Sequence, residues 1–180
     1  MEERQGDWIQ TYTGKKFWPL DPRVEDIDIK DIAHALSLTC RFGGHCNEFY
    51  SVAQHSVIVS QLVEESNAFV ALLHDAPEAY IGDVVRPFKK SLATFGNVEE
   101  NLERVIYHSF GISEFSKEMW KEADNIALYT EMRDLMGKPP EAWEDWTNYQ
   151  STIPRQKIVP LGPRESEQLF LRRYEQLTSV

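Results

Sequence analysis

Residues 68–89 read AFVALLHDAPEAYIGDVVRPFK, and the most apolar segment of the chain opens this stretch. Its first six residues are all apolar, which predicts a helix over residues 68–75 that is buried on every side. Asn67 is a candidate N-cap for this helix. Pro77 and Gly82 then interrupt the helical pattern. The chain is therefore predicted to be built around a short central helix.

The flanking sequence adds mostly helical segments. Residues 8–20 are rich in aromatic and β-branched residues around Thr13-Gly14, which predicts a short β-hairpin. Apolar residues then recur at helical spacing in five further segments, the first of which should stop near Gly43-Gly44 and the second of which has Ser51 as its cap. These segments are residues 28–38, 51–65, 97–110, 116–136 and 163–177.

The remaining stretches do not form further domains. Residues 137–140, GKPP, are a clear break, residues 143–146 are ambiguous between helix and loop, and residues 158–161 form a short extended piece. No internal repeat or linker divides the chain. We expect one domain, residues 1–180, of the all-α class: a helical bundle with a small N-terminal β-hairpin.

Composition excludes several classes of protein. The 180 residues carry a net charge of -10, with 29 acidic against 19 basic side chains, which argues against binding to nucleic-acid polymers. No apolar run is long enough to cross a membrane, and the N-terminus does not resemble a signal peptide. Cys40 and Cys46 do not form a disulfide framework. We expect a cytoplasmic protein without membrane partners.

Three predicted helices each direct a polar group toward the core. His55 shares a helical face with Val52 and Val59, and Asp124 lies on an apolar stripe of its own helix. His74 and Asp75 end the most apolar segment. Buried carboxylates are unfavourable unless they are paired or bound to a metal, and imidazole with carboxylate suits a first-row divalent ion. A single inward histidine is more often a core residue with satisfied hydrogen bonds, so spacing alone leaves both interpretations open.

Two more carboxylates lie close to this group in sequence. Glu78 follows His74 by four residues, so both project from one side if the helix continues past Pro77. A carboxylate beside a metal site can act as general acid or base. Asp83 follows Gly82 and fits either a turn or a place near the metal. On spacing alone, both could equally be solvated turn residues.

The order His55, His74-Asp75 and Asp124 resembles the H…HD…D signature of HD-domain phosphohydrolases. The longer strings VAQHS, residues 52–56, and LHDAPEAYIGDVVRPFK, residues 73–89, resemble the bacterial 5′-deoxynucleotidase branch. The flanking string CRFGGH, residues 40–45, together with FYSVAQH, residues 49–55, resembles phage and prophage members. These members include dATP triphosphohydrolases, so dATP is a candidate substrate.

The resemblance implies roles for individual residues. His55, His74, Asp75 and Asp124 would bind one divalent ion (Mg, Mn, Co, Ni, Fe or Zn), and a deoxynucleotide would be the substrate. Glu78 would be the catalytic acid or base and Asp83 its helper. Arg41 and Lys89 would contact phosphate or nucleotide. The family often has Trp after the arginine, where this chain has Phe42. A homo-oligomer is expected from the same resemblance.

Some candidates and alternatives stay open. His45 lies in a glycine-flanked loop and could touch base or phosphate or have no role. Phe42, Phe49 and Tyr50 could stack on a base, although aromatic residues are more often core. Besides a deoxynucleotide phosphohydrolase, either dATP-specific or a broad 5′-deoxynucleotidase acting on dNMPs, the same fold could serve as a non-catalytic nucleotide sensor. The presence of all four ligands and Glu78 favours an enzyme. A cyclic-dinucleotide hydrolase is disfavoured because no GYP-type motif is present.

Overall fold

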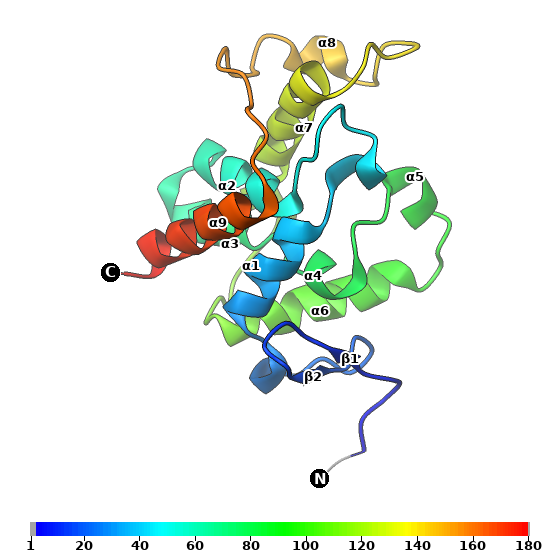
Figure 1. Cartoon of the computed structure of the whole chain (residues 1–180), viewed down its shortest axis with the longest axis vertical. Coiled ribbons are helices and arrows are strands. Elements are labelled where there is room, and N and C mark those ends of the chain that lie inside the picture. Colours follow the sequence, from blue (N-terminus) through cyan, green and yellow to red (C-terminus); the bar gives the residue numbers. More distant parts are fainter. Residues whose placement is uncertain (1–2, 180) are drawn as a thin grey trace.

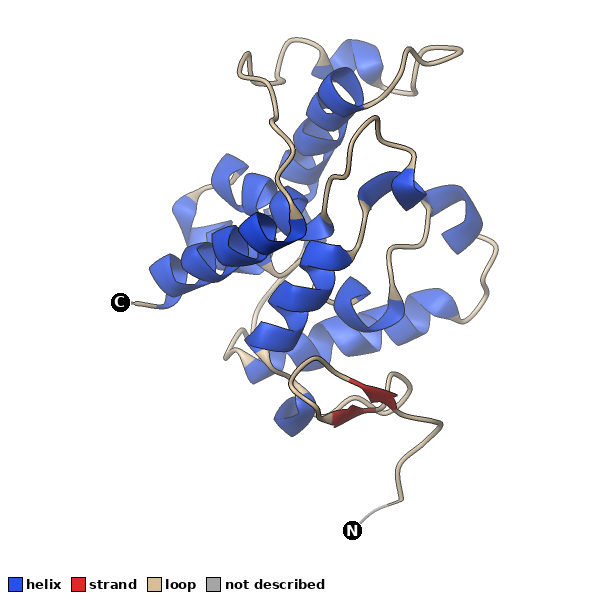
Figure 2. Ribbon diagram, in the orientation of Figure 1, coloured by secondary structure: helices blue, strands red, loops and turns tan. Residues whose placement is uncertain are grey.

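Helices dominate the computed structural model, which describes residues 3–179 (Figures 1 and 2). The predicted class, mostly helical with a small N-terminal hairpin, is confirmed. Short 3-10 turns occur at Val24–Asp26, Arg41–Gly44, Glu65–Asn67 and Lys117–Met119. The α-helices are α1 (Ile29–Leu38), α2 (Val52–Leu62), α3 (Ala68–Leu72), α4 (Glu78–Ile81), α5 (Arg86–Lys89), α6 (Phe95–Ser109), α7 (Lys121–Leu135), α8 (Trp146–Tyr149) and α9 (Pro163–Thr178).

The core lies where α1, α2, α3 and α9 pack together. The C-terminal helix α9 runs across α1 and α2 (Figure 1), and its Phe170 is fully buried. On α1, Ile32 and Leu36 are fully buried one turn apart, as the helical spacing predicts. Helix α7 also packs against α2. The packing therefore places the inward faces of α2 and α7 together.

The N-terminal hairpin is tied to α1 through its turn. Strands β1 (Ile9–Gln10) and β2 (Lys16–Phe17) pair antiparallel around the predicted turn. The buried carboxylate of Asp31 on α1 accepts hydrogen bonds from the Thr13 backbone N–H at 2.6 Å and from its hydroxyl at 2.9 Å. The aromatic ring of Phe17 is fully buried against that of Tyr80, with centroids 3.9 Å apart. The hairpin is thus part of the core packing.

The predicted central helix is shorter than expected. Helix α3 ends at Leu72, and the chain then passes through consecutive turns until α4 begins at Glu78. Pro77 has no N–H, and its ring conflicts with the carbonyl four residues earlier, so one continuous helix cannot form. The Asn67 cap is also wrong, because its side chain makes no cap hydrogen bond. His74 and Asp75 therefore stand in a turn between two helices.

Other boundaries also differ from expectation. The first helix ends at Leu38, before Gly43-Gly44, because Thr39 is extended and accepts from the Val52 N–H at 3.0 Å. The segment 116–136 begins with a 3-10 turn before α7. The Ser51 cap is confirmed, since its hydroxyl accepts from the Gln54 N–H at 3.1 Å. Among residues 3–179, no helix has both the length and the apolarity to cross a membrane.

Candidate metal centre and adjoining cavity

His55 points into the core from α2 and is fully buried. Its Nε2 atom lies 3.4 Å from Oδ1 of Asp124 on α7 and 3.5 Å from Oδ2 of Asp75. The predicted apolar faces explain this approach, because α2 and α7 pack on each other through the faces that carry these residues. Two groups 69 positions apart in sequence, His55 and Asp124, thereby meet.

The turn after α3 places His74 and Asp75 beside His55. The Nδ1 atom of His74 donates to the Ala71 carbonyl at 2.8 Å, because a carbonyl can only accept. The other ring nitrogen, Nε2, then faces Oδ2 of Asp75 at 3.2 Å. One donor atom each from His55, His74 and Asp124 lies within 4.8 Å of the others. The four predicted ligands are therefore brought together.

The chemistry of these atoms fits a divalent ion. Nε2 of His55, Nε2 of His74 and Oδ2 of Asp75 are buried, and none of them has a hydrogen-bond partner in the described part of the chain. Buried polar atoms without partners are rare and usually indicate a bound ion, water or a catalytic role. Two imidazole nitrogens and two carboxylates are a donor set that first-row divalent ions accept. The residues present thus fit the metal that the sequence predicts.

The electrostatics point the same way. Burial raises the pKa of Asp75, but the neighbouring histidines and Arg41 outweigh it and hold that pKa well below its usual range. The pKa of Asp124 is lowered by His55 despite burial. Burial and Arg41 lower the pKa of His55, yet Glu131 and Asp124 raise it to about 9. Ionised carboxylates therefore surround the two imidazoles and favour positive charge here, which is a proton on His55 when no ion is bound and the ion itself when it displaces that proton.

Glu131 is a member of this site that sequence reasoning missed. Its side chain on α7 is fully buried and contacts His55, Arg41 and Tyr50. It follows Asp124 by seven residues, which is two helical turns, so the two carboxylates share one face of α7. The seven-residue spacing is the feature of the sequence that could have identified Glu131, because Asp124 and Glu131 both lie on the side of α7 that faces α2.

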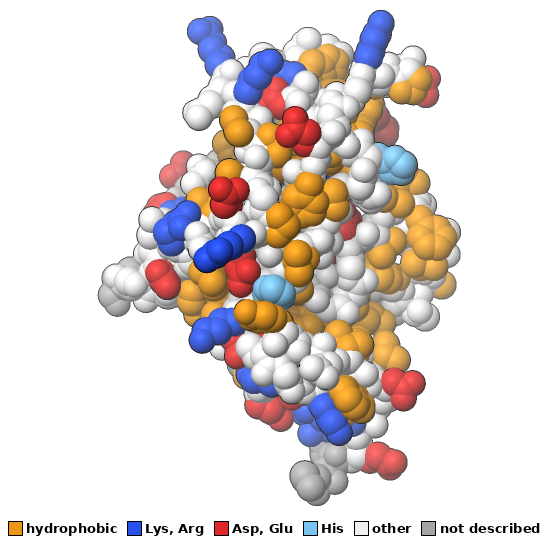
Figure 3. Space-filling model, in the orientation of Figure 1, with side chains coloured by type: hydrophobic (Ala, Val, Ile, Leu, Met, Phe, Trp, Pro, Cys, Tyr) orange, Lys and Arg blue, Asp and Glu red, His pale blue; other side chains and the backbone are white. Residues whose placement is uncertain are grey.

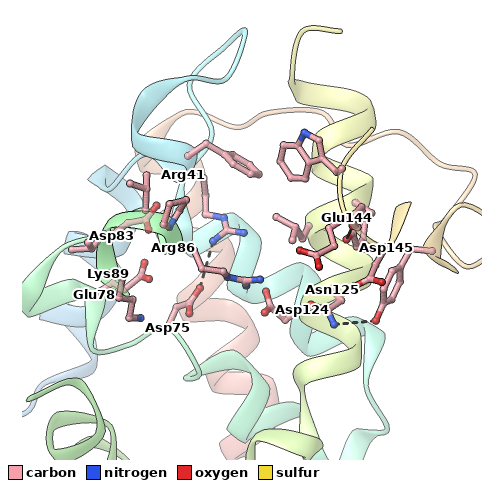
Figure 4. Close-up of a pocket in the computed structure, with 18 residues that line it drawn as sticks. Arg41, Asp75, Glu78, Asp83, Arg86, Lys89, Asp124, Asn125, Glu144 and Asp145 are labelled. Atoms are coloured by element: carbon pink, nitrogen blue, oxygen red, sulfur yellow. Dashed lines mark hydrogen bonds and ion pairs between the residues drawn. The ribbon is translucent and has the colours of Figure 1, made fainter. Parts of the chain in front are cut away.

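A cavity of about 520 Å³ opens beside the predicted ligands. Its volume lies within the usual range for small-molecule sites. Figure 4 shows its carboxylates on both sides, with the guanidinium groups of Arg41 and Arg86 projecting between them. Arg41 lies 3.9 Å from Asp75, through Nη1 and Oδ2. Other lining residues are Glu78, Asp83, Lys89, Asn125, Glu144 and Asp145.

The two predicted catalytic carboxylates both line the cavity. Oε2 of Glu78 is buried without a hydrogen-bond partner among residues 3–179. Burial raises the pKa of Glu78 well above its usual value, and the charges of Asp75 and Asp83 raise it further. Burial also raises the pKa of Asp83. A carboxyl whose pKa is shifted toward neutrality is suited to exchanging protons.

The predicted substrate contacts have mixed outcomes. Phe42 lines the cavity, and Lys89 lines it while pairing with Glu99. His45 is exposed and lies outside the cavity lining. Of the other two aromatic candidates, Tyr50 is buried against Glu131 and Phe49 is 37% exposed outside the lining. Of the three aromatic candidates, Phe42 is thus the one that a ligand in the cavity could touch.

Two features of the cavity were not identified from sequence. Arg86, at the start of α5, adds a second guanidinium to the cavity. An aromatic wall, defined by Phe42, Tyr129, Trp143 and Tyr149, forms part of the lining. The Tyr149 hydroxyl accepts from Asn125 at 3.0 Å and donates to Glu122 at 2.9 Å, which fixes this end of the wall. Residues 143–145 of the ambiguous segment and Tyr149 of α8 therefore form part of the cavity.

The surface has no continuous basic field on the face in Figure 3, where the basic and acidic side chains of the described residues are interspersed. This distribution agrees with the net charge of -10. Three basic side chains, those of Arg41, Arg86 and Lys89, line the cavity.

Two relatives cover most of the chain. It is 39% identical over 173 residues to the uncharacterized protein YfdR of Escherichia coli (strain K12), covering 96% of this chain and 97% of YfdR. It is 31% identical over 144 residues to an uncharacterized protein of Rhodobacter capsulatus, RCAP_rcc00048, covering 72% of this chain and 74% of that protein. No model of a known protein family matches. The chain therefore belongs to the same family as YfdR.

Proposed function

We propose that this protein is an HD-type phosphohydrolase that uses a divalent ion to remove phosphate from deoxynucleotides. One observation carries the proposal. Nε2 of His55, Nε2 of His74 and Oδ2 of Asp75 are buried, unpartnered among residues 3–179 and directed toward one another beside a cavity lined by cationic side chains. A metal site next to phosphate-binding groups is the arrangement that phosphate-ester hydrolysis needs.

The proposed metal would be held by His55, His74, Asp75 and Asp124. A divalent ion at this place supplies positive charge that polarises a phosphoryl oxygen and makes water more acidic. The hydrogen bond from His74 Nδ1 to Ala71 and that from His55 Nδ1 to Glu131 leave both Nε2 atoms available. The chain's contribution is therefore a fixed set of donor atoms.

The phosphate would be bound by the cavity's cations. Arg41 and Arg86 can each donate two parallel hydrogen bonds to phosphate oxygens, and Lys89 adds a point charge. These groups reduce the repulsion between a phosphate and the carboxylates around it. They also hold the phosphorus near the predicted ligands, which is the larger part of catalysis in phosphoryl transfer.

Glu78 would move the proton. Its raised pKa and its buried Oε2, which has no partner in the described part of the chain, suit a group that takes a proton from attacking water or gives one to the leaving oxygen. Asp83 lines the same side of the cavity and would orient that water or the leaving group.

The aromatic wall supports a nucleoside as the other half of the substrate. Aromatic rings stack on any nucleobase, and the cavity can hold a ligand of this size. Within this class, dATP is the finer proposal and rests on the resemblance to phage enzymes alone.

Phosphate release from dNMPs, dNTPs and NTPs, each with Mg²⁺, Mn²⁺ or Co²⁺, tests the function, with chromatography of the products. We expect turnover of deoxynucleotides that requires one of these ions. Selective turnover of dATP would identify a dATP hydrolase, and its product would identify the bond that is cleaved. Turnover of several dNMPs would indicate a 5′-deoxynucleotidase. Binding without turnover with any ion would reject the enzyme in favour of a nucleotide sensor.

A further inference from the structure

Glu131 is the most deeply buried carboxylate near the proposed metal. Its side chain is fully inaccessible to solvent, and both oxygens accept hydrogen bonds. Oε1 accepts from Nδ1 of His55 at 2.6 Å and from the Tyr50 hydroxyl at 2.9 Å, and Oε2 accepts from Nη2 of Arg41 at 3.0 Å. These three hydrogen bonds compensate the buried negative charge of the Glu131 carboxylate.

These partners come from separate parts of the chain. His55 is on α2, Arg41 opens the 3-10 turn Arg41–Gly44, and Glu131 is on α7. The sequence separations are 76 residues to His55 and 90 residues to Arg41. Glu131 therefore links His55 and Arg41, which share no direct hydrogen bond with each other among residues 3–179.

The contact with His55 determines which ring nitrogen faces the ligand cluster. A carboxylate accepts, so Nδ1 of His55 must carry the proton. Nε2 is then the nitrogen left beside Asp75 and Asp124, at 3.5 and 3.4 Å from their oxygens. A metal-bound histidine commonly donates its second ring N–H to a carboxylate, which fixes its tautomer and orientation.

The contact with Arg41 fixes the group proposed to bind phosphate. While Nη2 is held by Glu131, Nη1 lies 3.9 Å from Asp75 and the side chain lines the cavity. Arginine loses much side-chain entropy when it is ordered, so an anchor on one nitrogen prepares the others for a ligand.

We propose that Glu131 is a positioning residue that holds His55 in its Nδ1–H tautomer for the metal and, through its other oxygen, aligns Arg41 for phosphate. This inference rests on the proposed function, because it needs a metal at His55 and a phosphate at Arg41. It assigns no direct contact with substrate to Glu131.

The test compares Zn²⁺ affinity, by isothermal titration calorimetry, for the wild type and Glu131→Gln. The amide has one acceptor oxygen and turns an NH₂ group toward either His55 or Arg41, so both cannot be held. We expect Glu131→Gln to bind Zn²⁺ roughly 10- to 100-fold more weakly, as for other second-layer carboxylates. Tyr50→Phe is the matched control, since it removes one hydrogen bond to Glu131 without freeing His55. It should retain wild-type affinity.

Two further readouts separate positioning from a structural role. At saturating Zn²⁺, Glu131→Gln should bind inorganic phosphate more weakly than wild type. In ¹⁵N-labelled wild type loaded with Zn²⁺, NMR should show the His55 proton on Nδ1. This measurement needs no variant to fold. A proton on Nε2, or equal Zn²⁺ and phosphate affinities in wild type and Glu131→Gln, would overturn the inference.

His74→Ala distinguishes this inference from the proposed function. If His74→Ala loses Zn²⁺ while Glu131→Gln keeps it, the metal site stands and the positioning role is wrong. If His74→Ala binds Zn²⁺ like wild type, the metal site is wrong, and both proposals fail together.

Discussion

The rings of Phe42 and Trp143 meet edge to face, with centroids 6.3 Å apart and planes inclined by 61°. Phe42 also holds a left-handed backbone conformation, with φ of 56°, that non-glycine residues adopt at some cost. Strain of this kind persists where surrounding contacts enforce it, often at binding sites. The two rings belong to the aromatic wall of the cavity, where a base could stack.

Trp143→Ala should weaken deoxynucleotide binding and spare phosphate binding. Loss of one stacking ring is expected to raise the KM for a deoxynucleotide roughly 5- to 150-fold, equivalent to ~1–3 kcal/mol for each stacked base. Steady-state kinetics and titration with inorganic phosphate measure the two effects. Trp146→Ala is the matched control, because Trp146 lies three residues away outside the cavity lining. Equal losses in both variants would show that the segment acts through folding and not through stacking.

The pH dependence of turnover should report Glu78. If Glu78 accepts a proton in the reaction, kcat/KM falls as the pH drops through its pKa, which burial, Asp75 and Asp83 raise. Asp83→Asn removes one of the negative charges that raise this pKa. The acid limb of the profile should therefore move to lower pH, whatever the loss in maximal rate.

A pH–rate profile of Asp83→Asn against wild type measures that shift. Glu78→Gln provides the reference, since it should lower kcat by roughly 10²–10⁴-fold and remove the acid limb altogether. An acid limb that persists in Glu78→Gln would assign the titration to another group.

Asp31→Ala should destabilise the fold by detaching the hairpin turn from α1. It removes the acceptor for the Thr13 N–H and hydroxyl, so the expected loss in the free energy of unfolding is about 1–3 kcal/mol. Urea denaturation followed by circular dichroism measures it. Asp7→Ala, at an exposed position in the same N-terminal region, should leave the unfolding midpoint unchanged. A similar midpoint for both variants would contradict the anchoring role.

The features that the sequence predicts correctly are those in which local pattern and chemistry coincide. Four side chains that the sequence places on inward positions lie close together in the structure. His55 lies on an apolar helical face, His74-Asp75 follows an apolar run, and Asp124 lies on the apolar stripe of its own helix. These features depend on residues within a few turns of each other. The same is true of the hairpin and the Ser51 cap.

Other features depend on contacts between distant segments. Glu131 lies among polar residues on α7, and its role emerges when α7 meets α2 and the turn at Arg41. The segment 143–149 has little periodicity, and its place in the cavity comes from the contact of Tyr149 with Asn125. Long-range packing decided both of these, since the spacing of Glu131 from Asp124 indicates a shared helical face but not the contacts with His55 and Arg41. The end of α3 at Leu72 has a more local cause, because the effect of Pro77 reaches back one turn.

Phosphate release from deoxynucleotides by wild type and Asp75→Ala, with Mn²⁺ present and after its removal by a chelator, tests whether the protein is a metal-dependent phosphohydrolase. We expect turnover for wild type with Mn²⁺, its loss on chelation and its return when Mn²⁺ is restored. Asp75→Ala should be inactive throughout while its circular dichroism spectrum remains helical. Turnover by Asp75→Ala, or wild-type turnover that persists without any divalent ion, would contradict the assignment of the site.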